Sequence, residues 1–191
     1  MRIGFDAKRA VSNFTGLGNY SRFVISNLMK FYPKNTYKLF IPKFPSDDKI
    51  NTLSSDETHY TIKHTKKPFW RTMGIVKDIR REDLDIYHGL SNELPFKINK
   101  TKVKSIVTIH DLIFLKFPQF YSLIDRIIYN VKAKYACRVA DRIVAVSECT
   151  KRDIIKHYKI SPDKSEVVYQ GCFPVFKTKV EQNVKDETLT K

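Results

Sequence analysis

The sequence is poor in cysteine and has no long apolar run. Its three cysteines form no CxxC pair and no metal-ligand spacing, and an odd number is typical of free thiols in a reducing compartment. The most apolar stretch, 105–115, is interrupted by His110 and Asp111, so it does not suit a membrane-spanning helix. Because segment 1–6 also lacks the architecture of a signal peptide, we expect a cytoplasmic protein.

Acidic residues are scarce relative to basic ones. The chain has 20 Asp and Glu against 35 Lys and Arg, which gives a net charge of +15. Such a surface attracts phosphates, acidic polysaccharide, anionic lipid headgroups or nucleic acid. The basic residues are dispersed along the chain, so a solvated basic surface explains them equally well. The aromatic residues do not alternate with basic ones on a platform, and we therefore expect no nucleic-acid partner.

The remaining composition is that of a folded domain. The chain has 191 residues, of which 42% are hydrophobic and 13% aromatic. This is long enough for one full hydrophobic core and too short for a two-domain enzyme.

Short apolar runs alternate with longer segments of helical period. This alternation predicts an α/β fold, a doubly wound, Rossmann-like parallel sheet with helices on both faces. The expected strands are Arg2–Asp6, Tyr37–Ile41, His59–Lys63, Ile86–His88, Ser105–His110, Arg142–Ser147 and Glu166–Tyr169.

Four amphipathic helices are expected between these strands. Apolar residues recur at three- and four-residue steps over 20–31 and over 120–139. Pro68 is expected to open a third helix, and Ser147 or Glu148 a fourth that ends near Tyr158. Trp70 beside basic residues would suit contact with a membrane surface, but we expect it to lie on a buried helix face.

Ligands of open parallel sheets bind outside the carboxyl ends of the strands. After the first strand come Arg9 and then Gly16-Leu17-Gly18-Asn19-Tyr20, whose glycines and helix start would favour a phosphate or carboxylate. An ordinary glycine-rich loop explains the same spacing. A dinucleotide fingerprint does not fit, because Ser21 replaces the third glycine, and no Gly-Lys-Ser/Thr of a Walker loop occurs.

Polar residues also follow the fourth expected strand. His88, Ser91, Asn92 and Glu93 are predicted to lie on the ligand-facing rim, where either hydroxyl recognition or capping would explain them. The Gly-x-Ser within this segment is not a nucleophile elbow, because Glu93 stands where a second glycine is needed.

The next strand delivers His110 and Asp111 to the same rim. A titratable imidazole followed by a carboxylate suits proton exchange or a hydrogen bond to a substrate hydroxyl, although Asp111 would also cap the following turn. We expect no metal site, since only the distant His88 offers a further ligand. Ser147 and Lys151 lie where the sixth strand enters a helix, and either ligand contact or helix capping would explain them.

Together these segments resemble family-four retaining glycosyltransferases of the GT-B fold, particularly bacterial enzymes that extend surface polysaccharides with mannose or similar sugars. The resemblance extends from Met1 to about Phe176. It rests on the order and spacing of five segments: Gly16–Tyr20, Tyr87–Pro95, Val107–Leu112, Ala145–Glu148 and Val167–Cys172.

The resemblance implies a division of labour between two domains. Residues 1–176 would form the N-terminal, acceptor-side domain, and 177–191 a charged tail or the start of a linker. A C-terminal domain, missing here, would bind the nucleotide sugar, so we expect the chain to be inactive alone. It would be either a shortened form of a longer enzyme or a half that pairs with a separate partner. The nucleotide sugar would be a co-substrate, with no cofactor or obligatory metal, and the acceptor a glycan or lipid-linked glycan.

The resemblance also implies roles for single residues. Gly16 and Gly18 would approach the donor diphosphate, and His110 would be the catalytic residue, which hydrogen bonds the transferred sugar near the reacting carbon. Ser91, Asn92 and Glu93 would contact the acceptor or shape its pocket. Peripheral contact with the inner face of a membrane stays open, and a basic module that binds acidic glycan, anionic lipid or nucleic acid is the alternative function.

Overall fold

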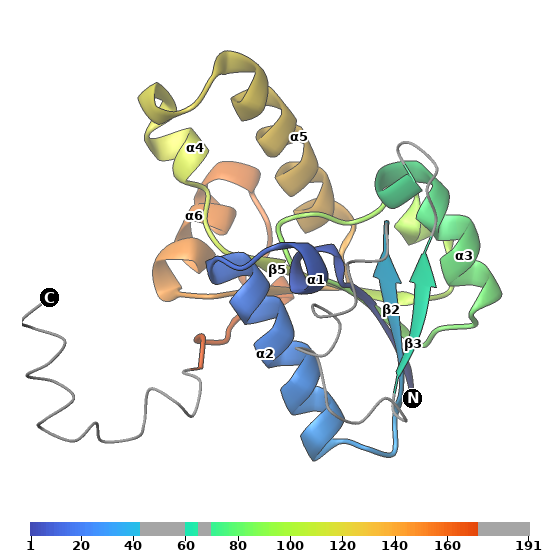
Figure 1. The fold of residues 1–191 in the computed structure, drawn as a ribbon. Helices are drawn as coiled ribbons and strands as arrows, with labels where there is room; N and C mark the ends of the chain where they lie inside the picture. Colours follow the sequence, from blue (N-terminus) through green and yellow to red (C-terminus); the bar gives the residue numbers. More distant parts are fainter. Residues whose placement is uncertain (43–59, 65–69, 172–191) are drawn as a thin grey trace, which may run out of the picture.

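A seven-stranded parallel sheet forms the centre of the computed structural model, which describes residues 1–42, 60–64 and 70–171 (Figure 1). The strand order is β3-β2-β1-β4-β5-β6-β7, and every neighbouring pair is parallel. This confirms the predicted doubly wound α/β class. The strands are β1 (Arg2–Asp6), β2 (Thr36–Ile41), β3 (Tyr60–His64), β4 (Ile86–Gly89), β5 (Lys104–Ile109), β6 (Arg142–Ala145) and β7 (Ser165–Val167).

Helices connect the strands. The α-helices are α1 (Lys8–Ser12), α2 (Gly16–Phe31), α3 (Ile75–Arg81), α4 (Ile113–Lys116), α5 (Leu123–Val139) and α6 (Glu148–Tyr158). A π-helix, η3 (Trp70–Gly74), leads into α3, and three short 3₁₀ turns are η4 (Ile98–Lys100), η5 (Pro118–Phe120) and η6 (Pro162–Lys164). Within the described residues no helix is long and apolar enough to cross a membrane.

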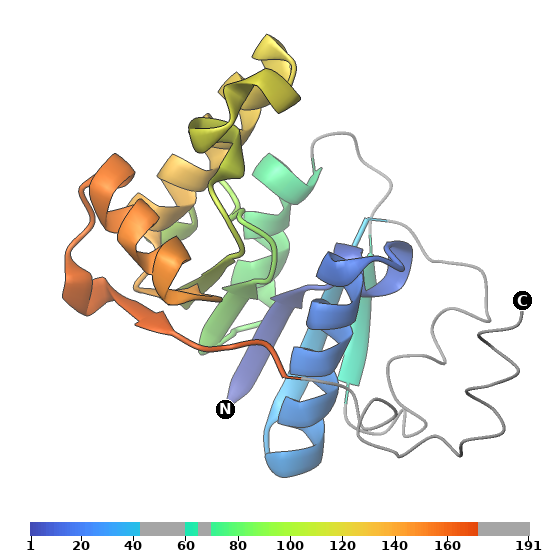
Figure 2. The same ribbon diagram turned by 90° about the vertical axis from the view of Figure 1, so that its left-hand side faces the viewer.

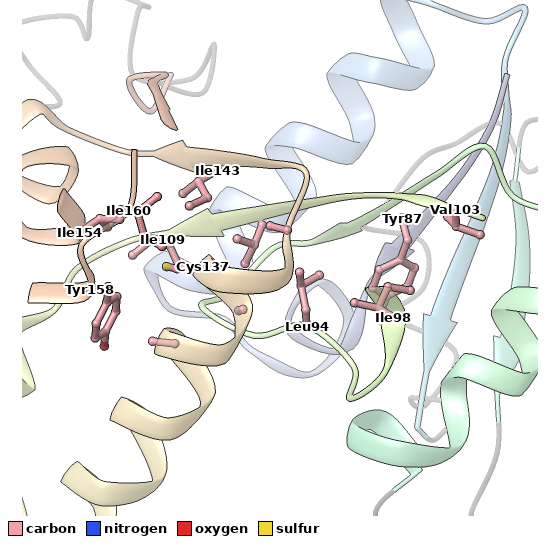
Figure 3. Close-up of a cluster of buried hydrophobic side chains, with 14 of the residues drawn as sticks. Tyr87, Leu94, Ile98, Val103, Ile109, Cys137, Ile143, Ile154, Tyr158 and Ile160 are labelled. Carbon is pink, nitrogen blue, oxygen red and sulfur yellow. The ribbon is translucent and has the colours of Figure 1, made fainter. Parts of the chain in front are cut away.

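The sheet separates two hydrophobic cores because successive side chains of a strand point to opposite faces. On β2, Leu39 packs with α1 and α2 on one face, whereas Phe40 packs with η3 and α3 on the other. The helices α1 and α2 cover the first face, and α3, α5 and α6 cover the second (Figures 1 and 2). The larger core runs from Tyr87 of β4 past Leu94 to Tyr158 of α6 (Figure 3).

Serine side chains define the starts of two helices. Ser122 accepts a hydrogen bond from the backbone N–H of Asp125 at the start of α5, and Ser147 accepts one from Thr150 at the start of α6. Each serine satisfies one of the N–H groups that a helix start leaves without an intrahelical partner. The predicted capping role of Ser147 is therefore confirmed.

The structure differs from the expected elements in three ways. Strand ends shift by one or two residues, and the two short helices α1 and α4 were not expected. The helix expected over 120–139 forms from Leu123, but apolar residues of its first half, such as Ile124 and Ile127, are exposed, and small residues such as Ala133 and Ala136 contact the sheet. Pro68 and the expected tail, 177–191, lie outside the described residues.

Candidate functional site

A pocket of about 380 Å³ lies at the carboxyl edge of the sheet. The strand order reverses there, because β1 has β2 on one side and β4 on the other. Such a switch point leaves a crevice between loops that diverge to opposite faces. The residues that line the pocket come from beyond three strands and from η3. Beyond β1 lie Lys8, Arg9 and Leu17, and beyond β4 lie Ser91, Asn92 and Glu93. The η3 helix contributes Arg71, and the chain beyond β5 contributes Asp111, Phe114, Tyr121, Tyr129 and Lys132.

The largely buried guanidinium of Arg71 connects several of the side chains at the pocket. Its Nε donates to Asp6 Oδ2 at 2.7 Å, and its Nη1 donates to Glu93 Oε2 at 3.0 Å. Its Nη2 also contacts Ser91 Oγ at 3.2 Å, and Lys132 Nζ reaches Glu93 Oε2 at 3.2 Å. Arg71 thereby joins η3 to the ends of β1 and β4 and fixes the side chains that line the pocket.

Two neighbouring carboxylates keep the side chain of Arg71 protonated. Burial lowers the pKa of Arg71, but the charges of Asp6 and Glu93 more than offset burial, so its pKa is raised above the usual value. Burial lowers the pKa of Lys8, and the neighbouring cations Arg71 and Arg9 lower it further. Four basic residues, Lys8, Arg9, Arg71 and Lys132, thus line the pocket with two acidic ones, Glu93 and Asp111.

Two pocket residues carry unused hydrogen-bonding capacity. Within the described part of the chain, Arg9 Nε and Glu93 Oε1 are buried and have no hydrogen-bond partner. Buried polar atoms are nearly always paired, and leaving one unpaired costs about 1–3 kcal/mol. The wall of the pocket thus holds one donor and one acceptor that lack a partner, both covered by neighbouring atoms.

His110 lies beside the pocket and is held from several sides. Its backbone N–H donates to Asn92 Oδ1 at 2.8 Å, and its ring packs edge-on against Tyr20 at 4.7 Å between centroids. The ring atom Nε2 lies 2.9 Å from the carbonyl oxygen of Leu90, and Nδ1 lies 3.3 Å from Gln170 Nε2.

These contacts assign the protonation of His110. A carbonyl only accepts, so Nε2 carries the proton and Nδ1 is the acceptor for Gln170. Burial lowers the pKa of His110, which keeps the ring neutral near pH 7. The predicted catalytic residue is therefore a neutral imidazole with a fixed orientation.

Asn92 shapes the loop that follows β4. Its φ of 57° lies in the left-handed region, which asparagine tolerates better than most residues. Its backbone N–H donates to the carbonyl of Thr108 while its side chain holds His110. The predicted rim residues after β4 and β5 are thus joined directly.

His88 does not lie on the exposed rim, contrary to the sequence prediction. Its imidazole is buried in the sheet, and Nε2 lies 2.9 Å from Thr108 Oγ1, which also contacts the hydroxyl of Tyr20 at 3.1 Å. Burial lowers the pKa of His88 to about 4. The alternation of β4 turns this side chain into the core, because the strand continues to Gly89.

The loop before α2 packs closely against the first turn of this helix. A Cβ atom at Gly18 would lie 1.7 Å from the carbonyl oxygen of Asn13, whereas one at Gly16 would meet nothing within 4 Å. The backbone N–H of Gly18 already donates to Asn13 Oδ1 at 3.2 Å, and Asn19 accepts from Arg22 at 2.6 Å. Gly18 permits close packing of backbone, and the exposed Gly16 is the glycine that a ligand can reach.

The remaining predicted residues lie on α6 beyond His110. Ser147 caps the helix, and the side chain of Thr150 donates to the carbonyl of His110 at 2.9 Å. Lys151 follows one position later and is partly exposed. Ser147 and Lys151 adjoin the histidine side of the site and do not line the pocket.

Sequence reasoning did not select several residues that line the pocket. No sequence pattern distinguishes Arg71 from the other basic residues near Trp70, and none points to Lys132. The aromatic wall of Phe114, Tyr121 and Tyr129 comes from α4, α5 and the connection between them. A buried Asp6 at the end of β1 is a signal that a cation must lie nearby. Among the described residues, no group of three or more His, Cys, Asp or Glu side chains could hold a metal ion.

Comparison with solved structures shows the same fold. The first match is HepE from Anabaena in complex with UDP and glucose, with a TM-score of 0.61 at 13% identity, covering 99% of this chain and 49% of that one. A glycosyltransferase from Rickettsia africae matches with a TM-score of 0.58 at 14% identity, covering 99% of this chain and 48% of that one. This chain thus spans about half the length of these proteins.

Comparison of sequences places the chain in a family. No curated protein matches it. Residues 35–172, well over half of the chain, match the family described as Glycosyltransferase Family 4. With its Rossmann-like fold and a pocket at the carboxyl edge of the sheet, the chain belongs to Glycosyltransferase Family 4.

Proposed function

We propose that this chain, through residues 1–176, is the acceptor-binding half of a retaining glycosyltransferase. The enzyme would transfer a hexosyl group from a nucleotide sugar to a growing surface glycan, free or linked to a lipid. The pocket at the switch point of the sheet carries this proposal, because it combines an aromatic wall with polar groups that have unused bonding capacity.

The acceptor fits the pocket by its chemistry. Phe114, Tyr121 and Tyr129 offer apolar faces to a sugar ring, and the charged side chains of Arg9 and Glu93 also line the pocket. Ser91, Asn92 and Asp111 add further polar groups at the rim. Oriented polar groups on an apolar surface are the usual basis of specificity in such sites.

The donor would approach from the side of Gly16 and His110. The start of the long helix α2 favours negative charge, so the donor diphosphate would lie against the exposed Gly16. In the transfer, the bond from the sugar carbon to the phosphate oxygen breaks and a bond to the acceptor oxygen forms on the same face. The proton of the acceptor hydroxyl leaves with the departing phosphate, and His110 orients the transferred sugar.

A second domain would supply most of the donor contacts. The structural neighbours are about twice as long, and the Anabaena protein binds UDP and glucose. We therefore propose that the chain alone is inactive, that a nucleotide sugar is its co-substrate, and that no further cofactor is required. The resemblance favours mannose as the transferred sugar, and glucose is the second candidate. Free Cys137 and Cys149 suit a cytoplasmic site of reaction, with peripheral membrane contact.

Isothermal titration of this chain tests the proposed division of labour. We expect glycan acceptors to bind with a Kd of about 1 mM or lower and nucleotide sugars to bind more weakly or not at all. Asp111→Asn should weaken acceptor binding about tenfold, because a charged acceptor of hydrogen bonds is lost while the turn cap to Ile113 is kept. Asp163→Asn, outside the pocket, is the matched control. Tight, salt-sensitive binding to duplex nucleic acid would instead establish the basic binding module.

Turnover by the complete two-domain enzyme tests the role of His110. His110→Ala should lower kcat far more than it lowers the stability of the fold, since an oriented imidazole acts in the transition state. His157→Ala, an exposed histidine of α6, is the control and should change neither. Equal activity of His110→Ala and the parent protein would remove His110 from the mechanism.

A further inference from the structure

The outer side of α5 is apolar where a surface helix is normally polar. The α5 apolar face consists of Phe120, Leu123, Ile124, Ile127, Ile128 and Val131, and the first three side chains are 69–76% exposed. The opposite side of the helix contacts the sheet through small residues, Ala133, Ala136 and Cys137. A contiguous exposed apolar patch of this kind marks an interaction surface.

This face is carried on a projection from the molecule. In both ribbon views, α4 and the first turns of α5 extend away from the sheet, at the end of the molecule opposite the C-terminal end of α2 (Figures 1 and 2). The inner side of the same projection supplies Phe114, Tyr121 and Tyr129 to the pocket. A surface that meets the outer side of α5 would therefore lie close to the acceptor pocket.

Basic residues follow the apolar tip. The α5 sequence contains four basic residues, Arg126, Lys132, Lys134 and Arg138, and a single acidic one, Asp125, which is bonded to Ser122. Phe96 extends the apolar surface by packing on Tyr135 of α5, with ring centroids 5.3 Å apart, and Lys97 lies over Phe96. An apolar tip with a basic belt matches the layers of an anionic bilayer, in which acyl chains lie beneath charged headgroups.

We propose that the α5 apolar face docks on an anionic lipid bilayer, with Phe120, Leu123, Ile124 and Ile127 entering the interface. Docking assigns the peripheral membrane contact of the proposed function to a defined surface, and it does not depend on the transfer reaction. One consequence of docking rests on the proposed function: the pocket would collect acceptors that are held at the bilayer surface.

Charge favours a bilayer over a second copy of the chain. Two copies would each bring a net charge of +15 and the same basic half of α5 to the contact, so they would repel each other. Trp70, the other aromatic residue weighed for membrane contact, is only 5% exposed and donates to Asp78. The surface proposed to face the membrane is therefore on α5 and does not include Trp70.

Co-sedimentation with lipid vesicles tests the docking without donor or acceptor. We expect the protein to bind vesicles of phosphatidylcholine with phosphatidylglycerol, to bind pure phosphatidylcholine weakly, and to lose binding as salt rises. Ile124→Ser with Ile127→Ser should lower the partition coefficient about tenfold or more, because two apolar side chains no longer enter the interface. Isoleucine and serine have similar helix propensities, so α5 should persist.

Matched variants separate the apolar and the electrostatic contributions. Phe31→Ser with Tyr32→Ser removes two equally exposed apolar residues at the far end of α2 and should leave vesicle binding unchanged. Lys134→Gln with Arg138→Gln should abolish most of the preference for phosphatidylglycerol. Circular dichroism and Tm of each variant confirm that the fold is retained.

Several outcomes would overturn the proposal. Absence of binding to anionic vesicles would do so, as would equal binding by the Ile124/Ile127 variant and the parent protein. Concentration-dependent dimers that the same variant abolishes would show instead that α5 pairs with a second copy. Because vesicle binding needs no substrate, its failure would leave the transfer reaction to be judged by the acceptor titration.

Discussion

Replacing Arg71 with methionine should destabilise the fold more than any exposed ion pair could. Methionine keeps an unbranched side chain of similar length and removes the guanidinium, so the change isolates the charge and its hydrogen bonds. The side chains of Arg71, Asp6 and Glu93 are 15%, 6% and 11% exposed, so solvent screens them little. We therefore expect a large effect on the free energy of unfolding.

The contacts of Arg71 set the magnitude. Glu93 would keep its contact with Lys132 at 3.2 Å, whereas Asp6 would keep only the backbone N–H of Lys8 at 3.3 Å. One buried carboxylate is thus left without a cation in contact with it, and breaking a buried pair in this way costs about 3–5 kcal/mol. Because only Asp6 is stranded, we expect about 3 kcal/mol, which corresponds to a fall in Tm of about 6–12 °C for a chain of this length.

Chemical denaturation of a double-mutant cycle measures this cost. Arg71→Met with Asp6→Asn should recover part of the lost stability, because the stranded charge is removed along with its partner. Arg2→Met, which breaks the exposed pair with Asp83, should cost no more than about 1 kcal/mol. A loss below about 1 kcal/mol for Arg71→Met, or no recovery in the double variant, would refute the assignment of Arg71 as the organising cation.

Two further predictions concern Gly18 and His88. Gly18→Ala should lower the free energy of unfolding in denaturant by about 3 kcal/mol, because its Cβ would lie 1.7 Å from Asn13 O. Gly16→Ala should change the same free energy by less than about 0.5 kcal/mol. Equal effects of the two variants would contradict the close packing at Gly18. The pKa of His88 is lowered to about 4 from 6.5, so the unfolded state binds more protons between these values. The stability linked to the neutral form of His88, about 3 kcal/mol, is fully present above the unfolded pKa and is lost as pH falls toward the folded pKa. The free energy of unfolding, measured against pH, should therefore fall over this range, and His88→Gln should make the fall smaller.

The sheet and its order of elements could be predicted because each element carries its own pattern. Apolar runs of four to six residues identify the strands, and Ser147 before an acidic first turn identifies the start of α6. The gathering of Asn92, His110 and Asp111 on one edge follows from the parallel sheet alone. These predictions need only local sequence and one rule about parallel strands.

Contacts between distant segments could not be predicted in the same way. Arg71 pairs with Asp6 across 65 positions, and this pairing depends on η3 lying over the ends of β1 and β4. In a chain with 35 basic residues, the buried Asp6 does not identify its own partner. The side of α5 that contacts the sheet could not be predicted either, because small residues such as Ala133 and Ala136 pack inward while larger ones such as Ile124 and Ile127 are exposed.

The most direct measurement of the central claim is an NMR titration of the isotope-labelled chain with glycan acceptors. The account predicts that amide shifts concentrate at Arg9, Ser91, Asn92 and Asp111, which come from the ends of three different strands but line one pocket. Shifts that fall instead on a face remote from the carboxyl edge of the sheet would contradict it, as would unchanged spectra at saturating glycan.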